Sequence, residues 1–399
     1  MQFIGKFEYQ FYLSTITSMK PFIAILLLFY SCLSWAQPKF VPNPQAVPRQ
    51  PTPTLAIGAK APDFRLPASD GKYYSLKDFA SAKVLVIIFT CTHCPTAQAY
   101  EDRIKAIVTD YKSKGVSVIA ISPNSPISVL LEELGYTDLN DDYENMAIRA
   151  KDKGYNFPYL YDGDTEATSI KYGPVATPHA FVFDSQRLLK YNGRLDGIEK
   201  PGQANAEDLR AAIDATLAGK EVATPVTKTF GCSVKWAWNT EYKAKNEKNW
   251  ESRPVNLEEL DTEGVKKLVS NDSDKLRLIN VWATWCGPCI LEYPDFLELQ
   301  RMYGARDFEF VSLTADKMDK KDKALKFLQS KHSGVKNYIF KEDDTYKLIE
   351  AIDPKWNGAL PYTLLIEPGG KVIYSLQGSI ESLKLKKLIV EHPKIGRYF

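Results

Sequence analysis

Two cysteines separated by two residues, Cys286 and Cys289, constrain this chain more than any other feature, because a strand is expected to give way to a helix there. Residues 276–282 are apolar and β-prone enough for a buried strand, and residues 290–299 carry apolar side chains at helical spacing. At a helix N-terminus, free N–H groups and the helix dipole favour a thiolate on Cys286, the more exposed cysteine. Cys289, one turn on, can then attack a mixed disulfide, so the spacing indicates disulfide exchange.

A second pair, Cys91 and Cys94, stands in the same context earlier in the chain. The uninterrupted apolar run 84–90 predicts a strand covered on both faces, and a helix is expected at 96–109. Further elements are expected as a strand at 116–121, helices at 127–134 and 143–153, and a strand pair at 177–183 and 188–193. Alternating strands and helices that end in a hairpin indicate an α/β fold with a mixed sheet.

The region after residue 253 repeats this pattern. Helices are expected at 257–269, 286–303, 323–331 and 381–390, and strands at 276–282, 308–313, 358–366 and 371–376. We therefore expect two tandem α/β domains, each with a central mixed sheet flanked by helices. Their expected bounds are 55–217 and 253–399, with a linker at 218–252. Residues 37–54 are expected to be a stiff Pro-rich tether or, alternatively, a disordered leader left by processing.

Composition excludes some partners. The 51 basic and 49 acidic residues give a net charge of +2, which offers no electrostatic reason to expect nucleic acid or an anionic membrane as partner. With 44% hydrophobic residues, the 399-residue chain has enough apolar material for ordinary cores.

Residues 1–36 are predicted to be a signal peptide. The apolar run 21–30 precedes Ser34-Trp35-Ala36, a small-x-small site that could be cut before Gln37. Met19 could be the true start of translation. The run is shorter than the about 20 residues that a membrane span needs, although an uncleaved anchor stays open, as does lipidation of Cys32. Export across the inner membrane implies an extracytoplasmic, periplasmic protein.

Five cysteines remain after cleavage: two C-x-x-C pairs and Cys232. The C-x-x-C spacing in an exported chain indicates redox chemistry rather than a scaffold of structural disulfides. Three interpretations of Cys232 stay open: a free buried thiol, an exchange partner for Cys91 or Cys94, or an intermolecular link.

The first domain resembles the redoxin (AhpC/TSA-like) branch of the thioredoxin superfamily. The resemblance covers 55–217 and rests on Ala61-Pro62-Asp63-Phe64, on the strand that leads into residues 89–95, and on Ala176-Thr177-Pro178. It implies a cis proline at Pro178 that faces the cysteines, with Thr177 beside it at the substrate-binding position.

The first domain departs from true peroxiredoxins, whose reactive cysteine stands in a P-x-x-x-T-x-x-C motif. Ahead of Cys94 the proline and threonine places hold Ile87 and Cys91, and ahead of Cys91 they hold Val84 and Ile88. Dithiol exchange is therefore favoured over peroxide reduction.

The second domain is similar to TlpA/ResA-type thioredoxins over 253–399. The resemblance rests on residues 281–289, on Leu360-Pro361-Tyr362-Thr363, and on Pro294, which matches a proline that kinks the active-site helix. It implies that Leu360 and Pro361 form the cis-proline segment that binds substrate, with Trp285 beside the cysteines.

Proton handling is implied at Glu292. Thioredoxins keep a buried carboxylate six residues before the first cysteine, where this chain has Asn280; the ResA-like branch instead has a glutamate three residues after the second cysteine, where this chain has Glu292. Glu292 is thus the expected proton acceptor for Cys289, and the alternative is an ordinary exposed glutamate in a first helical turn. Leu85 and Ala97 fill the two matching places around the first pair.

The residues between the cysteines differ. Gly287-Pro288 is the thioredoxin pair, associated with a reducing couple, whereas Thr92-His93 places an imidazole beside the first pair. A charged histidine lowers the pKa of a nearby thiol and stabilises the reduced form, so the first site is expected to be more oxidising and to receive electrons from Cys286 and Cys289. Alternatively, His93 is a solvent-facing loop residue without a tuning role.

The sequence thus predicts an extracytoplasmic thiol–disulfide oxidoreductase that acts on protein disulfides and takes electrons from a membrane thiol donor. No cofactor beyond its own disulfides is expected: the two pairs lie too far apart in sequence for a zinc ribbon, and no C-x-x-C-H haem motif or Gly-rich phosphate loop occurs. A thiol peroxidase reduced by its own second domain and a thioredoxin-fold binding module are the alternatives. The client protein and the oligomeric state stay open.

Overall fold

The computed structural model of the chain describes residues 40–398. The predicted signal peptide, the Met19 start and lipidation at Cys32 lie outside these residues. Within residues 40–398, no helix has both the length and the apolar character needed to cross a membrane.

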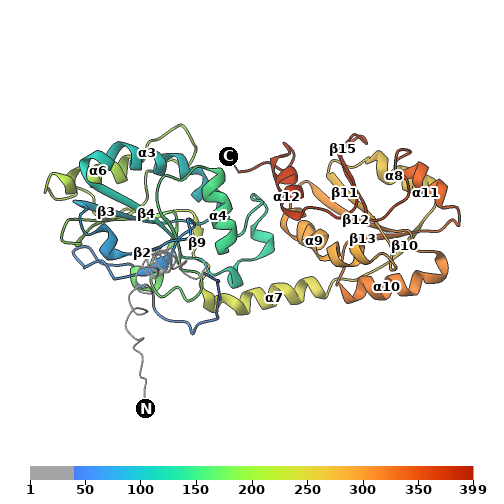
Figure 1. The fold of residues 1–399 in the computed structure, drawn as a ribbon, viewed down its shortest axis with the longest axis horizontal. Coiled ribbons are helices and arrows are strands. Elements are labelled where there is room, and N and C mark those ends of the chain that lie inside the picture. Colours follow the sequence, from blue (N-terminus) through green and yellow to red (C-terminus); the bar gives the residue numbers. More distant parts are fainter. Residues whose placement is uncertain (1–39, 399) are drawn as a thin grey trace, which may run out of the picture. The chain divides into compact units, whose positions relative to one another are not determined.

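The first domain is built on a five-stranded sheet of order β5-β4-β3-β7-β8. Figure 1 labels its neighbouring strands β3 and β4. The central strand, β3 (Val84–Phe89), is buried at every residue, as its uninterrupted apolar run predicts. It pairs parallel with β4 (Val116–Ser122), which pairs parallel with β5 (Tyr159–Tyr161). On its other side β3 pairs antiparallel with β7 (His179–Phe183), which pairs antiparallel with β8 (Leu189–Gly193).

The other elements of this domain are short. They are β1 (Arg65–Pro67), β2 (Tyr73–Ser75), η1 (Leu76–Phe79), α2 (Pro95–Ala99), α3 (Glu101–Tyr111), η2 (Lys112–Lys114), α4 (Tyr143–Asp152), α5 (Ser169–Tyr172), β6 (Ala176–Thr177) and α6 (Glu207–Leu217). The helix expected at 96–109 is divided at Tyr100, which joins α2 to α3.

The helix expected at 127–134 is wrong. Two 3₁₀ turns, η3 (Pro126–Ser128) and η4 (Leu131–Glu133), take its place. Between them Val129 and Leu130 have extended backbone angles and buried side chains. Burial of these two side chains by an extended segment therefore replaces the helical periodicity that the apolar spacing suggested.

The Pro-rich segment before the first domain is attached to it. The amides of Asn43 and Gln45 donate to Asp164, and the amide of Leu55 donates to the carbonyl of Tyr172. The segment forms no helix or strand over residues 40–54, in keeping with its prolines.

The region expected as a linker contains β9 (Cys232–Ser233), η5 (Ala237–Asn239) and α7 (Thr240–Glu251). The charged run that was expected to be linker is thus a three-turn helix, in which Trp250 is the buried residue.

The second domain has a six-stranded sheet of order β10-β13-β12-β11-β14-β15. Its strands are β10 (Glu258–Leu260), β11 (Leu276–Trp282), β12 (Phe308–Thr314), β13 (Lys336–Phe340), β14 (Tyr362–Ile366) and β15 (Val372–Gln377). The central β11 is buried throughout, pairs parallel with β12 and pairs antiparallel with β14. Its helical elements are α8 (Thr262–Ser270), α9 (Gly287–Tyr303), η6 (Met318–Lys320), α10 (Lys321–Ser330), α11 (Thr345–Ile352) and α12 (Ser382–Glu391).

The helix expected at 257–269 is wrong in its first part. Residues Glu258–Leu260 form β10, which pairs parallel with β13, and the helix begins only after Asp261. Asp261 accepts the amide of Gly264 and so caps α8. Both domains nevertheless show the predicted α/β fold, a mixed sheet flanked by helices.

Candidate functional site

The second-domain pair lies where β11 meets α9. Cys286 is the N-cap residue of α9, its Sγ accepts the amide of Cys289 at 3.3 Å, and the two cysteines form a disulfide. Cys286 is 6% exposed and Cys289 is fully buried, so the first cysteine is the more exposed one, as expected. The helix N-terminus therefore stabilises negative charge on the more exposed of the two sulfurs.

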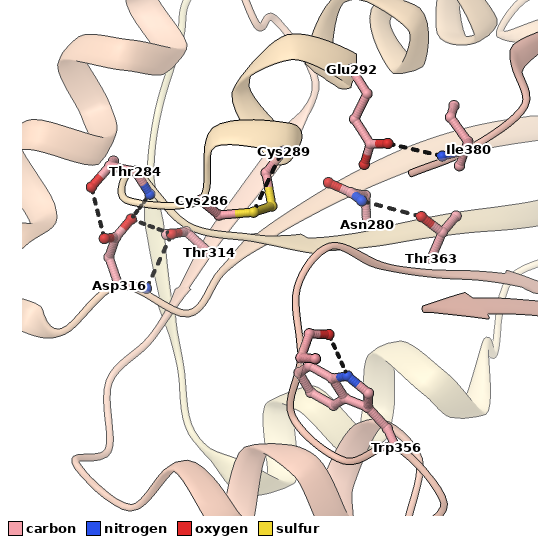
Figure 2. The surroundings of a disulfide bond; sticks show 11 residues. Asn280, Thr284, Cys286, Cys289, Glu292, Thr314, Asp316, Trp356, Thr363 and Ile380 are labelled. Carbon is pink, nitrogen blue, oxygen red and sulfur yellow. Dashed lines mark hydrogen bonds between the residues drawn. A yellow bond between two sulfur atoms is a disulfide. The ribbon is translucent and has the colours of Figure 1, made fainter. Parts of the chain in front are cut away.

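The loop before Cys286 is held by Asp316, which sequence reasoning missed. Its carboxylate accepts the amide and the hydroxyl of Thr284, each at 2.8 Å, and the hydroxyl of Thr314 at 2.7 Å (Figure 2). Asp316 stands two residues after β12, in no motif, and only the parallel pairing of β11 with β12 brings it to this loop.

The predicted cis-proline segment is present. The Leu360–Pro361 peptide bond is cis, and Pro361 directly precedes β14, the antiparallel neighbour of β11. Trp356 supports the segment because its Nε1 donates to the carbonyl of Ala359 at 2.8 Å (Figure 2). Trp285, beside Cys286, is 69% exposed.

Glu292 is buried, with 6% of its surface exposed, so the alternative of an ordinary exposed glutamate is wrong. Figure 2 shows its carboxyl group pointing toward Ile380, whose amide donates to Oε2 at 2.9 Å. Its Oε1 has no hydrogen-bond partner among residues 40–398. Burial raises the pKa of Glu292 to about 7, against the opposing effect of the Ile380 amide. A carboxyl group that titrates near neutrality thus lies one turn from Cys289.

The first-domain pair differs in where its helix begins. α2 begins at Pro95, so Cys94 is the N-cap residue and its Sγ accepts the amide of Ala97 at 3.5 Å. In the second domain, by contrast, the first cysteine holds this position. Cys91 and Cys94 are both buried, at 2% and 0% exposure, and both are free thiols. The position that stabilises a thiolate therefore belongs to the second cysteine here.

His93 forms a buried ion pair with Asp141. Its Nδ1 lies 2.5 Å from Oδ2 of Asp141, and the two side chains are 2% and 0% exposed. The alternative of a solvent-facing His93 is therefore wrong. The Oδ1 atom of Asp141 accepts the amides of Thr92 and His93, and Asn124 donates to Oδ2 at 2.6 Å. Sequence reasoning missed Asp141 and Asn124, because each lies in a loop far from the cysteines in sequence.

These contacts set the charges of the first site. Burial opposes a charge on His93, but Asp141 raises the pKa of His93. Burial alone would raise the pKa of Cys94, but hydrogen bonds from Cys232 and Cys91 and the charge of His93 lower it well below its usual range. Burial and the hydrogen bond to Cys94 raise the pKa of Cys91 well above its usual range. The N-cap position and these pKa directions therefore favour Cys94 over Cys91 as the thiolate of this site.

Three donor atoms of the first site have the spacing of a small metal site. One atom each from Cys91, His93 and Asp141 lie within 4.8 Å of one another. Both oxygens of Asp141 already accept hydrogen bonds, from two amides, His93 and Asn124, so a metal ion would have to replace the ion pair. The arrangement suits charge and proton handling at the thiols.

In the first domain, the expected substrate-binding segment at Thr177 and Pro178 is covered by another part of the same chain, strand β9. The Thr177–Pro178 peptide bond is cis, and both residues are buried. Thr177 lies in β6, which pairs antiparallel with β9 and places Thr177 opposite Cys232. Cys232 packs against Cys91 and Cys94, and the Thr177 hydroxyl lies 3.2 Å from Cys91 Sγ.

Both domains match known families. Residues 57–192 match the AhpC/TSA family, and residues 248–388 match the Redoxin family. A thiol-disulfide oxidoreductase, ResA, from Bacillus thuringiensis subsp. konkukian is 31% identical over 136 residues, which cover 32% of this chain and 70% of that protein. The chain belongs to the thioredoxin-like redoxin proteins, as a tandem of an AhpC/TSA domain and a Redoxin domain. Both predicted family resemblances are thus confirmed.

Other relatives match one domain's length. A Mycobacterium tuberculosis H37Rv protein whose name places it among the peroxiredoxins is 32% identical over 117 residues. The match covers 29% of this chain and 62% of that protein's length. Among solved structures, a hypothetical protein from Sinorhizobium meliloti 1021 is 32% identical, with a TM-score of 0.41 over 46% of this chain and 96% of that one.

Proposed function

We propose that this tandem redoxin is an extracytoplasmic thiol–disulfide oxidoreductase that reduces protein disulfides through Cys286 and Cys289. One observation carries the proposal: a disulfide at a helix N-terminus has the more exposed of its two cysteines first and a buried carboxyl group with a pKa near 7 one turn beyond its second cysteine. Reactive dithiols need this combination of access, charge stabilisation and proton handling.

In the reduced protein, the Cys286 thiolate attacks a substrate disulfide, forms a mixed disulfide and releases one substrate thiolate. The Glu292 carboxylate takes the proton of Cys289, and the Cys289 thiolate then attacks the sulfur of Cys286. This step releases the second substrate thiolate and leaves the Cys286–Cys289 disulfide. Two electrons have passed to the substrate, and its thiolates take up the protons.

The substrate peptide would lie along Leu360 and Pro361, with Trp285 in contact beside Cys286. The exposed indole supports this placement, since large apolar side chains at the surface commonly mark contact sites. A membrane thiol donor would return electrons to Cys286. The location of this chain outside the cytoplasm is supported by its apolar run at residues 21–30.

The two sites would differ in reduction potential. The His93 charge and the Cys232 hydrogen bond stabilise the Cys94 thiolate, which favours the reduced form of the first pair. The first site should therefore be more oxidising and receive electrons from Cys286 and Cys289. Redox titration of full-length variants that each keep one C-x-x-C pair tests this direction, and equal or reversed potentials would rule out the relay.

Insulin reduction with dithiothreitol as electron donor tests the proposed activity. The wild-type chain should catalyse the reaction and Cys286→Ser should be much slower, because only the first domain can then exchange disulfides. A wild-type chain without activity would instead support a binding module. Peroxide consumption by the wild-type chain and Cys91→Ser tests the peroxidase alternative. A peroxidase would lose turnover with Cys91, whereas a dithiol reductase has little peroxide turnover to lose.

A further inference from the structure

Cys232 is the one described cysteine that the proposed exchange reaction does not use. It lies in β9, partly exposed, whereas Cys91 and Cys94 beneath it are buried. Cys91 at 2% and Cys94 at 0% exposure are covered more completely than Cys286 at 6%, and exchange requires the attacking sulfur to contact the attacked one. The first domain therefore needs either a rearrangement or a third thiol.

The backbone around Cys232 is built for close approach to the cis-proline segment. β9 pairs antiparallel with β6, and Thr177 lies opposite Cys232. Gly231 has φ +129°, and a Cβ atom there would lie 2.1 Å from the carbonyl oxygen of Thr177. Only glycine permits this contact, so the residue before Cys232 is specifically suited to holding the strand against the active site.

The residues after Cys232 fasten the same segment to the first domain. The amide of Lys235 donates to Oδ1 of Asn124 at 2.9 Å, and the carbonyl of Lys235 accepts the amide of Ser125. The amide of Ala237 donates to Oε2 of the buried Glu166 at 2.8 Å. Because Asn124 also donates to Asp141, one side chain connects the Cys232 segment to the ion pair beside the thiols.

We propose that Cys232 is the third redox cysteine of the first domain, which exchanges with external disulfides and passes the oxidation to Cys94 and then to Cys91. This assignment rests on the proposed function in that the first domain exchanges disulfides at all. Cys232 packs against Cys94. The hydrogen bond to Cys94 and burial raise the pKa of the Cys232 thiol, whereas the pKa of Cys94 is lowered, so the Cys94 sulfur is the group that takes the proton when Cys232 attacks.

The steps balance. The Cys232 sulfur attacks an external disulfide, releases one thiolate and forms a mixed disulfide. Cys94 attacks the Cys232 sulfur, its proton passes to the second external thiolate as that group leaves, and a Cys94–Cys232 disulfide forms. Cys91 then attacks the Cys94 sulfur, its proton passes to the departing Cys232, and the Cys91–Cys94 disulfide remains. Two thiols have been oxidised, one external disulfide has been reduced to two thiols, and Cys232 is restored.

The test uses the full chain with Cys286→Ser and Cys289→Ser, which leaves the first domain as the redox site, and dithiodipyridine as the probe disulfide. Adding Cys91→Ser should stop the sequence at the second step: both pyridinethione molecules are released, and peptide mapping finds Cys94 linked to Cys232. A lasting pyridyl adduct on Cys232, with one pyridinethione released, would overturn the proposal.

Two further variants keep Cys91 and Cys94 intact. Cys232→Ser should slow oxidation of the Cys91–Cys94 pair by about tenfold or more, since the buried sulfurs then lack an accessible partner; an unchanged rate would contradict the proposal. Gly231→Ala should also slow it. Gly219→Ala is the matched control, because Gly219 has φ +66° but open space around its Cβ position. If Gly231→Ala and Gly219→Ala oxidise the Cys91–Cys94 pair at equal rates, the proposed need to hold Cys232 against the active site is contradicted.

The role of Cys232 and the proposed reductase function are tested separately. Insulin reduction is measured with the second domain intact, and the Cys94–Cys232 link is measured in the variants described above. Insulin reduction without a Cys94–Cys232 link overturns the role of Cys232 alone. A Cys94–Cys232 link in a chain that cannot reduce insulin overturns the proposed function alone. Stoichiometric zinc retained by the reduced protein would also contradict the three-thiol sequence, because the metal would occupy the sulfurs.

Discussion

The Nδ1 atom of His93 lies 2.5 Å from Oδ2 of Asp141, and both side chains are buried beside two free thiols. Asp141 raises the pKa of His93 in a place where burial alone would lower it. The charge on His93 in turn lowers the pKa of Cys94. The tuning of the first site is therefore expected to depend on Asp141, a carboxylate that lies outside the C-x-x-C motif in the sequence.

Asp141→Asn should make the first site more reducing. The substitution removes the charge that raises the pKa of His93, so the Cys94 thiolate and with it the reduced form lose stabilisation. We expect the reduction potential to fall by about 30 mV or more, a tenfold change in the equilibrium. Redox titration of the Cys286→Ser, Cys289→Ser background measures it. Asp102→Asn, which removes an exposed carboxylate of the same domain, is the control; an equal effect of both substitutions would contradict the role of the ion pair.

Glu292→Gln should abolish the change in second-site activity that occurs near pH 7. Wild-type disulfide reduction should rise as the pH passes through about 7, because the carboxylate form accepts the Cys289 proton. The variant should be slower on the order of a hundredfold above that pH and lack this inflection. The pH profile of kcat/KM for insulin checks both. Glu298→Gln, farther along α9 and partly exposed, should keep the wild-type profile.

The same glutamate should lower stability at high pH. Its pKa is raised from 4.5 to about 7 in the folded protein, so its favourable contribution is complete below pH 4.5 and is lost as the pH rises through about 7. Glu292→Gln carries no such charge and should be more stable than wild type at pH 8, on the order of 2 kcal/mol. Urea unfolding of the oxidised proteins at pH 5 and pH 8 measures the difference. A wild-type advantage at pH 8 would contradict the buried, neutral state.

Trp285→Ala should weaken protein substrates selectively. The indole is 69% exposed beside Cys286, and exposed tryptophans at contact sites often dominate binding. We expect kcat/KM for insulin to fall about tenfold while the rate with a small aromatic disulfide stays unchanged. Tyr242→Ala, which removes another exposed aromatic side chain at 65% exposure, should change neither rate.

Local pattern was sufficient for the parts of the fold that carry the cysteines. The fully apolar β3 and β11 could be predicted because a strand buried on both faces needs an uninterrupted apolar run. The helix expected at 257–269 failed at β10, since pairing with β13, a distant strand, decides the conformation of Glu258–Leu260.

The site was predictable only where a motif carried it. Both cysteine pairs and both cis prolines are present where the family resemblance placed them. Asp141 and Asp316 act through loops that approach the cysteines only after the sheets have formed, so no local spacing indicates them. The helix start at Cys94 rather than Cys91 was also hidden, because it depends on how Pro95 begins α2.

A trapped intermediate tests the central claim most directly. The full chain carrying Cys289→Ser is reduced, mixed with insulin and quenched with acid, and the products are mapped without reduction. The account predicts an insulin chain joined to Cys286 by a disulfide that dithiothreitol releases. No adduct, or an adduct on cysteines of the first domain with Cys286 still a free thiol, would contradict it.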